Sequence, residues 1–90
     1  MTDADGLANL DVTIAQFIAP RLKAFRETEK GHPSDLTQEE WDEQLADMQF
    51  AFDLVSSDDY FRSVGWDDTK RARYQRGMDL FRERFEQLWT

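Results

Sequence analysis

The 90-residue chain has no cysteine, one histidine, four glycines and two prolines. The absence of cysteine excludes disulfides and thiolate zinc sites, and it fits a reducing compartment. Four scattered glycines cannot form the glycine-rich loop that cradles a phosphate. The only histidine, His32, precedes a proline and has no serine or second histidine placed to form a nucleophile relay, so we interpret it as a turn residue. We therefore expect no catalytic residues, no metal site and no cofactor.

Long hydrophobic runs are also missing, since no stretch approaches the roughly 20 apolar residues that span a bilayer. The opening MTDADG is acidic and lacks the charged-then-apolar pattern of a secretory signal. We expect one domain over residues 1–90, with residues 1–9 disordered, located in the cytoplasm without a membrane partner.

The net charge of −8 is unevenly placed. Residues 32–69 carry eleven Asp or Glu against Arg62, whereas residues 70–90 carry six Lys or Arg against three acids. An acidic middle disfavours direct binding to nucleic acid, because phosphate affinity comes from neutralising cations. It suits a basic protein partner, or a homo-oligomer in which basic ends meet acidic middles. Carboxylates such as Glu43 and Asp47 could also mimic nucleic acid phosphates.

The central segment predicts a helix and its starting point. Thr37 and Glu40 match the capping box, in which side chain and backbone bond reciprocally, while Leu36 and Trp41 occupy the positions of a hydrophobic staple. Apolar residues then follow at helical spacing, which predicts one buried stripe: Trp41, Leu45, Met48, Phe52 and Val55.

A first helix is predicted from Leu10, with Asp11 or Thr13 as its cap and Gly31 as its stop. Its apolar stripe contains Leu10, Ile14, Phe17, Ile18, Leu22 and Phe25. Pro20 interrupts this stripe, so the helix either kinks or restarts there.

A last helix is predicted from about Lys70 to Trp89, capped by Asp67, Asp68 or Thr69. Its stripe has the same spacing as the central one: Tyr74, Met78, Phe81, Phe85 and Leu88. Gly77 lies beside that stripe, where glycine is unfavourable in a helix, and either a close backbone approach or an accident of ancestry would explain it. We predict an all-α three-helix bundle with an antiparallel pair formed by the central and C-terminal helices and a Pro-kinked first helix.

Three groups of side chains are candidate binding residues. Phe50 and Leu54 lie opposite the central stripe, where they either meet the first helix or form an interface. Tyr60, Phe61 and Trp66 form an aromatic segment that is either a lid on the core or a recognition patch. Arg73, Arg76 and Arg84 suit a phosphate-bearing ligand or an acidic surface; we favour pairing with the acidic middle of the same or a neighbouring chain.

Two stretches of the sequence are distinctive: T-x-E-E-W at 37–41 and the tail G-x-x-L-F…F-x-x-L-W at 77–89. Together they resemble a group of small uncharacterised phage and prophage helical proteins. Further likeness lies in IAPRLKAF at 18–25 and GHP at 31–33, so that it spans roughly residues 14–90 but not residues 56–69. The resemblance implies a phage origin and an intracellular helical domain, and it supplies no catalytic residue.

These observations favour a small phage-encoded protein-interaction module, which binds and modulates a host or phage protein through its acidic central helix and the aromatic 60–66 segment. The alternative is an oligomer that sequesters a nucleotide-like ligand. A further alternative is similar to the all-α magnesium-dependent nucleotide pyrophosphohydrolases, since Glu39-Glu40-x-x-Glu43 is matched by Glu83-x-x-Glu86. Because Glu40 caps the helix and a helical wheel places Glu43 and Asp47 on its outer face, we interpret these acids as a solvated flank.

Overall fold

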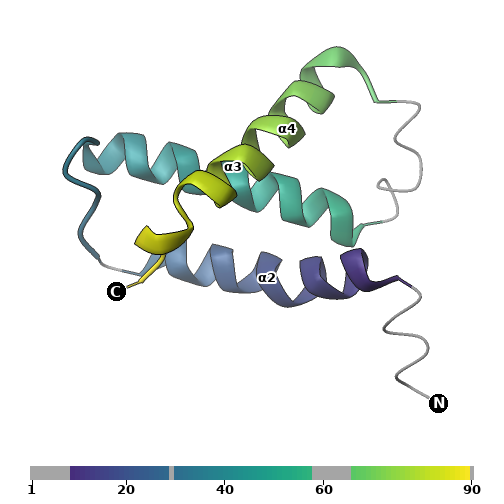
Figure 1. The fold of residues 1–90 in the computed structure, drawn as a ribbon, viewed down its shortest axis with the longest axis horizontal. Coiled ribbons are helices and arrows are strands. Elements are labelled where there is room, and N and C mark those ends of the chain that lie inside the picture. Colours follow the sequence, from purple (N-terminus) through teal and green to yellow (C-terminus); the bar gives the residue numbers. More distant parts are fainter. Residues whose placement is uncertain (1–8, 29, 58–65, 90) are drawn as a thin grey trace.

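The computed structural model describes residues 9–28, 30–57 and 66–89. They form three α-helices, α2 (Leu10–Glu27), α3 (Gln38–Ser56) and α4 (Asp68–Glu83), and a short 3-10 helix, η2 (Phe85–Gln87) (Figure 1). The predicted all-α three-helix fold is confirmed, and these residues include no strand. None of the described helices is long and apolar enough to cross a membrane. Residues 1–8, Tyr60 and Phe61 lie outside the described residues.

Helix α3 is the centre of the fold. It runs antiparallel to α2, and α4 returns obliquely across it, so α3 packs against both other helices (Figure 1). Its stripe residues Trp41, Leu45 and Met48 are fully buried. The core is completed by short or aliphatic side chains of the neighbouring helices: Ala15, Ala19 and Leu22 from α2, and Leu80 from α4.

The start of α3 follows the predicted capping box. The Glu40 amide donates to the Thr37 hydroxyl at 3.0 Å, and the Thr37 amide donates to the Glu40 carboxylate at 2.8 Å. Two backbone donors that the helix leaves unsatisfied are thereby paired.

Helix α2 runs unbroken through Pro20, so the alternative that a second helix restarts there is wrong. The Arg21 guanidinium donates to the Phe17 carbonyl at 2.9 Å, within the turn that the proline disturbs. The predicted caps Asp11 and Thr13 are also wrong, because the helix already begins at Leu10 and Asn9 occupies the cap position.

The end of α2 lies at Glu27, so the predicted stop at Gly31 is wrong. Side chains beyond the helix satisfy its last carbonyls instead. The Thr28 hydroxyl donates to the Ala24 carbonyl at 2.7 Å, and the Lys30 ammonium donates to the Arg26 carbonyl at 3.0 Å. These bonds end the helix without a left-handed glycine, and Gly31 has no positive φ.

Helix α4 begins as predicted, since the Asp67 carboxylate accepts from the Lys70 amide at 2.7 Å. It ends at Glu83 rather than at Trp89, so that boundary was wrong. The chain then turns at Arg84 into η2, which lies near the C-terminal half of α2 (Figure 1). Because of this turn, Phe85 and Leu88 lie beside Ile18, Leu22 and Phe25 of α2.

The contact between α3 and α4 depends on Gly77, which is buried. A Cβ atom at this position would overlap the Asp47 carbonyl oxygen and lie 2.8 Å from the Ala51 Cβ. The predicted close backbone approach at Gly77 is therefore confirmed.

Candidate functional site

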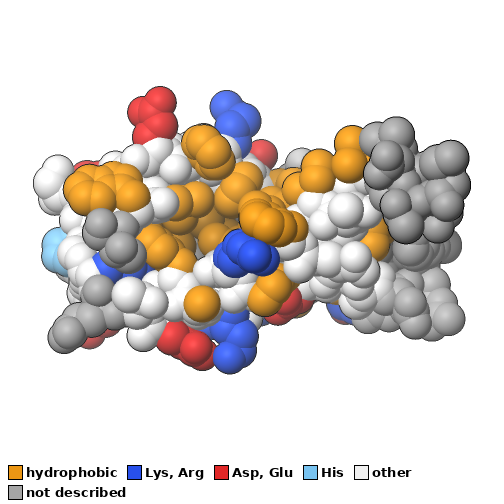
Figure 2. Space-filling view, turned by 90° about the horizontal axis from the view of Figure 1, so that it is seen from below, with side chains coloured by type: hydrophobic (Ala, Val, Ile, Leu, Met, Phe, Trp, Pro, Cys, Tyr) orange, Lys and Arg blue, Asp and Glu red, His pale blue; other side chains and the backbone are white. Residues whose placement is uncertain are grey.

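A hollow of about 280 Å³ lies at one end of the helices and is lined by Gly31, His32, Pro33, Trp41, Gln87 and Trp89. A separate apolar groove of about 220 Å³ lies between α2 and the C-terminal end of the chain. Aliphatic and aromatic side chains line it, with one guanidinium at the edge: Ile18, Arg21, Leu22, Phe25, Phe81, Phe85 and Leu88. Figure 2 shows hydrophobic side chains gathered around a hollow on this side of the molecule.

The groove exists because α2 and α4 both pack on α3 and leave a space between them. Its inner wall is tied to the core, since the Phe81 ring packs edge-on against Phe52 with centroids 4.8 Å apart. Phe85 continues this wall outward, 5.7 Å from Phe81, and its side chain is 61% exposed. The turn at Arg84 brings Phe85 to this position. Aromatic walls with an open edge are typical of surfaces that bind another protein.

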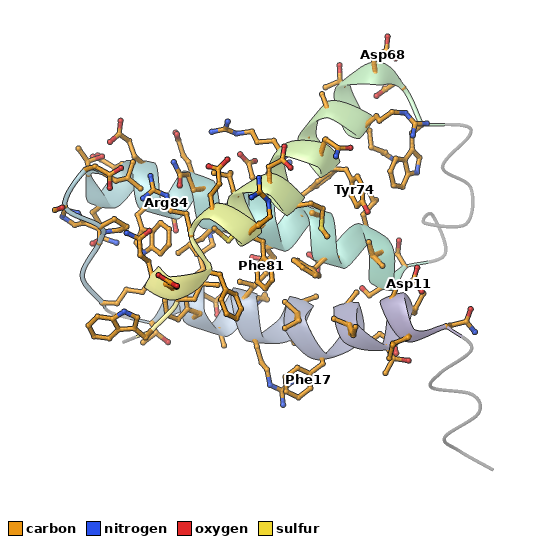
Figure 3. The ribbon with its side chains drawn as sticks, in the orientation of Figure 1. Asp11, Phe17, Asp68, Tyr74, Phe81 and Arg84 are labelled. Carbon is orange, nitrogen blue, oxygen red and sulfur yellow. The ribbon has the colours of Figure 1, made fainter. Side chains whose placement is uncertain are left out.

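A second apolar surface lies on the outer side of α2. Leu10, Ile14 and Phe17 are 47%, 48% and 56% exposed, and their 4-3 spacing places them on one line along the helix. Figure 3 shows the Phe17 side chain pointing away from α3 and α4. The Arg21 guanidinium stacks on the Phe17 ring at 3.7 Å and remains exposed.

The acidic candidates of α3 have different surroundings. Glu43 is exposed. The Asp47 side chain is only 19% exposed and forms ion pairs with Arg73 at 3.0 Å and Arg76 at 2.9 Å. The prediction that Asp47 lies on the outer face is therefore wrong, because α4 covers that flank of α3. Its charge is neutralised inside the chain.

The third arginine is also paired. Arg84 reaches the loop before α3 and binds Asp35 through two nitrogens, at 3.2 and 3.0 Å, while its Nε donates to Gln44 at 3.2 Å. The hydrogen bond from Arg84 lowers the pKa of the Asp35 carboxyl, and the same bond raises the pKa of Arg84. The interpretation that Arg73, Arg76 and Arg84 pair with acids of the same chain is confirmed.

Phe50 and Leu54 are placed by α3 on the side away from the Trp41 stripe. Leu54 is 8% exposed. Phe50 is half-buried, and the Arg73 guanidinium lies 4.3 Å above its ring. Phe50 thus contacts Arg73 of α4, and its contact with the first helix stays a prediction.

Trp66 is the one residue of the predicted aromatic segment that the structure describes. Its ring packs edge-on against Tyr74 at 5.3 Å, and the Arg71 guanidinium lies 5.6 Å from the ring. Trp66 therefore covers the first turns of α4. For Tyr60 and Phe61, a place in a lid or a recognition patch stays a prediction.

The carboxylates of the hydrolase alternative are not gathered. Within residues 9–28, 30–57 and 66–89, no three His, Asp or Glu side chains are close enough together to hold a metal ion. Asp47 faces Arg73 and Arg76, and Glu40 closes the capping box.

The groove residues were missed as a site by the sequence analysis, because their apolar stripes were interpreted only as core. One signal was available: the apolar residues of the first helix are too many for one face, since Phe17 and Ile18 are adjacent and cannot both point to α3. The position of Phe85 had no such signal, because it depends on the turn at Arg84.

The chain matches no protein-family model, no curated protein and no solved structure. The geometry of the groove and of the charged surfaces is therefore the basis for assigning a function.

Proposed function

We propose that this chain is a small protein-interaction module, of phage origin as its resemblance implies, that binds a host or phage protein and modulates it. The apolar groove between α2 and η2 carries the proposal. A contiguous apolar hollow on a small protein marks a binding surface, because exposing it to water is unfavourable. Its walls of aliphatic and aromatic side chains suit the apolar face of a partner helix.

The charge of the chain adds a second element of recognition. Helix α3 contains six Asp or Glu and no Lys or Arg. Of these, Glu39 and Glu43 are exposed and form no ion pair with the described residues. They would steer a basic region of the partner toward the module and increase the association rate more than the affinity. Asp47 contributes less to this role than the sequence suggested, because two arginines neutralise it.

The alternative of a ligand-sequestering oligomer has less support. It needs Arg73, Arg76 and Arg84 to face a phosphate-bearing ligand, whereas each of them already binds a carboxylate of the same chain. A ligand would have to displace Asp47 and Asp35 before it could use these guanidinium groups.

The proposal is tested by affinity capture from a lysate of the host bacterium, using the wild-type chain and two single variants. Phe85→Ser removes an exposed wall of the groove and should abolish capture of the specific partner while the helical circular-dichroism spectrum is kept. Ile14→Ser is the control, since Ile14 is 48% exposed and lines neither the groove nor the hollow at Trp41, and it should capture the same partner. Equal capture by wild type and Phe85→Ser would overturn the groove as the binding site.

A further inference from the structure

A pocket separate from the groove lies where the connection between α2 and α3 meets the C-terminal end of the chain (Figure 1). Its volume is about 280 Å³. The connection contributes Gly31, His32 and Pro33 to its lining, the C-terminal end contributes Gln87 and Trp89, and α3 contributes Trp41. We call this cavity the Trp41 pocket. Its size is at the lower end of the range for small-molecule sites, so it suits a ligand with one ring system.

The Trp41 indole has a hydrogen-bond donor that the fold leaves unused. Its side chain is only 1% exposed, yet its Nε1–H donates to no acceptor within the part of the chain that the structure describes. Every fully buried side-chain nitrogen or oxygen of these residues does have a partner. The indole nitrogen therefore lies at the small surface that Trp41 shares with the pocket. Because an N–H group without a partner is unfavourable in such a place, this donor favours an acceptor inside the pocket.

The other polar side chains of the pocket are His32 and Gln87. The His32 Nδ1 lies 2.9 Å from the Pro33 carbonyl oxygen, and a carbonyl only accepts, so Nδ1 carries the hydrogen and Nε2 of the neutral imidazole is an acceptor. The Gln87 Oε1 accepts from Arg84 at 3.0 Å, which leaves the amide NH₂ group as a donor. The pocket therefore offers two donors and one acceptor, and its described lining includes no Lys, Arg, Asp or Glu.

The outer wall of the pocket is aromatic. Trp89 lines the pocket and is 74% exposed, so a face of its ring is in water. Such a face gains contact when a flat ring stacks on it, and stacking of this kind accepts many aromatic heterocycles. The wall thus selects a flat ligand, whereas the polar groups select where its acceptors and donors lie.

We propose that the Trp41 pocket binds a flat heteroaromatic ring that carries a ring-nitrogen acceptor, which is the chemistry of a purine base. The ring nitrogen accepts from the Trp41 Nε1–H, an amino group donates to His32, and the ring stacks on Trp89. The ligand is recognised by its base and not by a phosphate, because no cation lines the pocket. The inference goes beyond the proposed function, since the pocket and the protein-binding groove share no lining residue.

The first test compares ligands by calorimetric titration of the full chain. Benzimidazole and indole have the same shape, but only benzimidazole has a ring-nitrogen acceptor, so it should bind at least about tenfold more tightly. Adenine, adenosine and AMP then distinguish a free base, a nucleoside and a nucleotide as the source of the ring. All three should bind, and AMP should bind no more tightly than adenosine. Equal binding of benzimidazole and indole, or binding of AMP alone, would overturn the proposal.

The second test locates the ligand on the protein. The chain has three tryptophans, so its NMR spectrum has three indole N–H signals, which Trp66→Phe and Trp89→Phe assign. The Trp41 signal should move downfield with benzimidazole and stay in place with indole. This measurement needs no substitution of Trp41, whose burial makes it important for folding. An unmoved Trp41 signal at saturating benzimidazole would place the ligand elsewhere and overturn the proposal.

Variants of the lining give an independent test. Trp89→Ala removes the stacking surface and should weaken adenine binding about tenfold. Gln87→Glu keeps an oxygen for Arg84 but removes the amide donor, and it should also weaken binding. Phe17→Ala is the matched control, since Phe17 is a second exposed aromatic residue that lies outside the pocket lining. Phe85→Ser should lose the protein partner and keep adenine, so failure of the groove and failure of the pocket are distinguishable. Wild-type affinity in Trp89→Ala would exclude the proposed stacking and overturn the site.

Discussion

Gly77 of α4 lies so close to Asp47 of α3 that a Cβ atom at position 77 would overlap the Asp47 carbonyl oxygen. The contact is between the two backbones, which cannot move aside as the end of a flexible side chain can. The absence of a side chain at Gly77 therefore allows the short distance between the two helices. Asp47 holds the same crossing electrostatically, because Arg73 and Arg76 bind it from the turn before Gly77.

Gly77→Ala is expected to destabilise the fold by about 2 kcal/mol. Alanine favours an isolated helix by roughly 1 kcal/mol relative to glycine, but the overlap with Asp47 must be relieved by moving α4 away from α3, and such overpacking costs about 1–3 kcal/mol or more. Urea unfolding followed by circular dichroism measures the change.

Gly31→Ala is the control for this substitution. No atom lies within 4 Å of the Cβ that it would add, and Gly31 has no positive φ. The variant should be neutral or more stable by about 0.5 kcal/mol, because alanine restricts the unfolded chain. An increase in stability for Gly77→Ala as well would contradict the close helix crossing.

Local signals in the sequence were sufficient to predict much of the fold. The capping box at Thr37 and Glu40 and the Asp67 cap each depend on residues three positions apart, and the central stripe depends on helical spacing. Gly77 could be singled out because glycine is unfavourable inside a helix, although the backbone that it approaches, at Asp47, is remote in the sequence. Helix ends were less accurate. Gly31 looked like the stop of the first helix, but Thr28 and Lys30 end it earlier by bonding the last carbonyls. The last helix was predicted too long because no sequence signal near Arg84 indicates a turn.

The candidate site was less predictable because it depends on how the helices are placed. A helical wheel gives the side of α3 on which Asp47 lies, but not that α4 covers this side. Likewise, Phe85 continues the apolar stripe of the last helix in the sequence, whereas the turn at Arg84 moves it to the edge of the groove. Tertiary contacts of this kind have no signature within one helical segment.

Asp47→Ala is expected to lower the stability by about 1 kcal/mol, because it removes one carboxylate that binds two arginines. The Arg73 and Arg76 side chains are 46% and 60% exposed, so solvent compensates part of the loss and salt should reduce it. Urea unfolding at low and high salt measures both effects.

Asp53→Ala is the matched control, since Asp53 is exposed on the same helix and its side chain accepts a hydrogen bond from the Gln49 amide at 3.4 Å. It should change stability by less than about 0.5 kcal/mol. The same pair of variants tests whether Asp47 masks the arginines: Asp47→Ala should bind inorganic phosphate more tightly than wild type, and Asp53→Ala should not. Equal phosphate binding by all three chains would show that the ion pairs do not restrict Arg73 and Arg76.

The pairing of Asp35 with Arg84 predicts a dependence of stability on pH. The hydrogen bond from Arg84 lowers the pKa of Asp35 in the folded chain relative to the unfolded chain. The contribution of this pair is therefore fully present above the ordinary carboxyl pKa of about 4, and it is lost as the pH falls through the lower, folded value. Asp35→Asn should be less stable than wild type at pH 7, and the two unfolding curves should approach each other below about pH 4.

Asp79→Asn serves as the control, because Asp79 is exposed and forms no ion pair with the described residues. The difference in unfolding free energy between wild type and Asp35→Asn would instead stay constant from pH 7 to pH 2 if the Asp35 side chain acted through packing or loop geometry. That result would show that the charge of Asp35 does not hold η2 against the loop before α3.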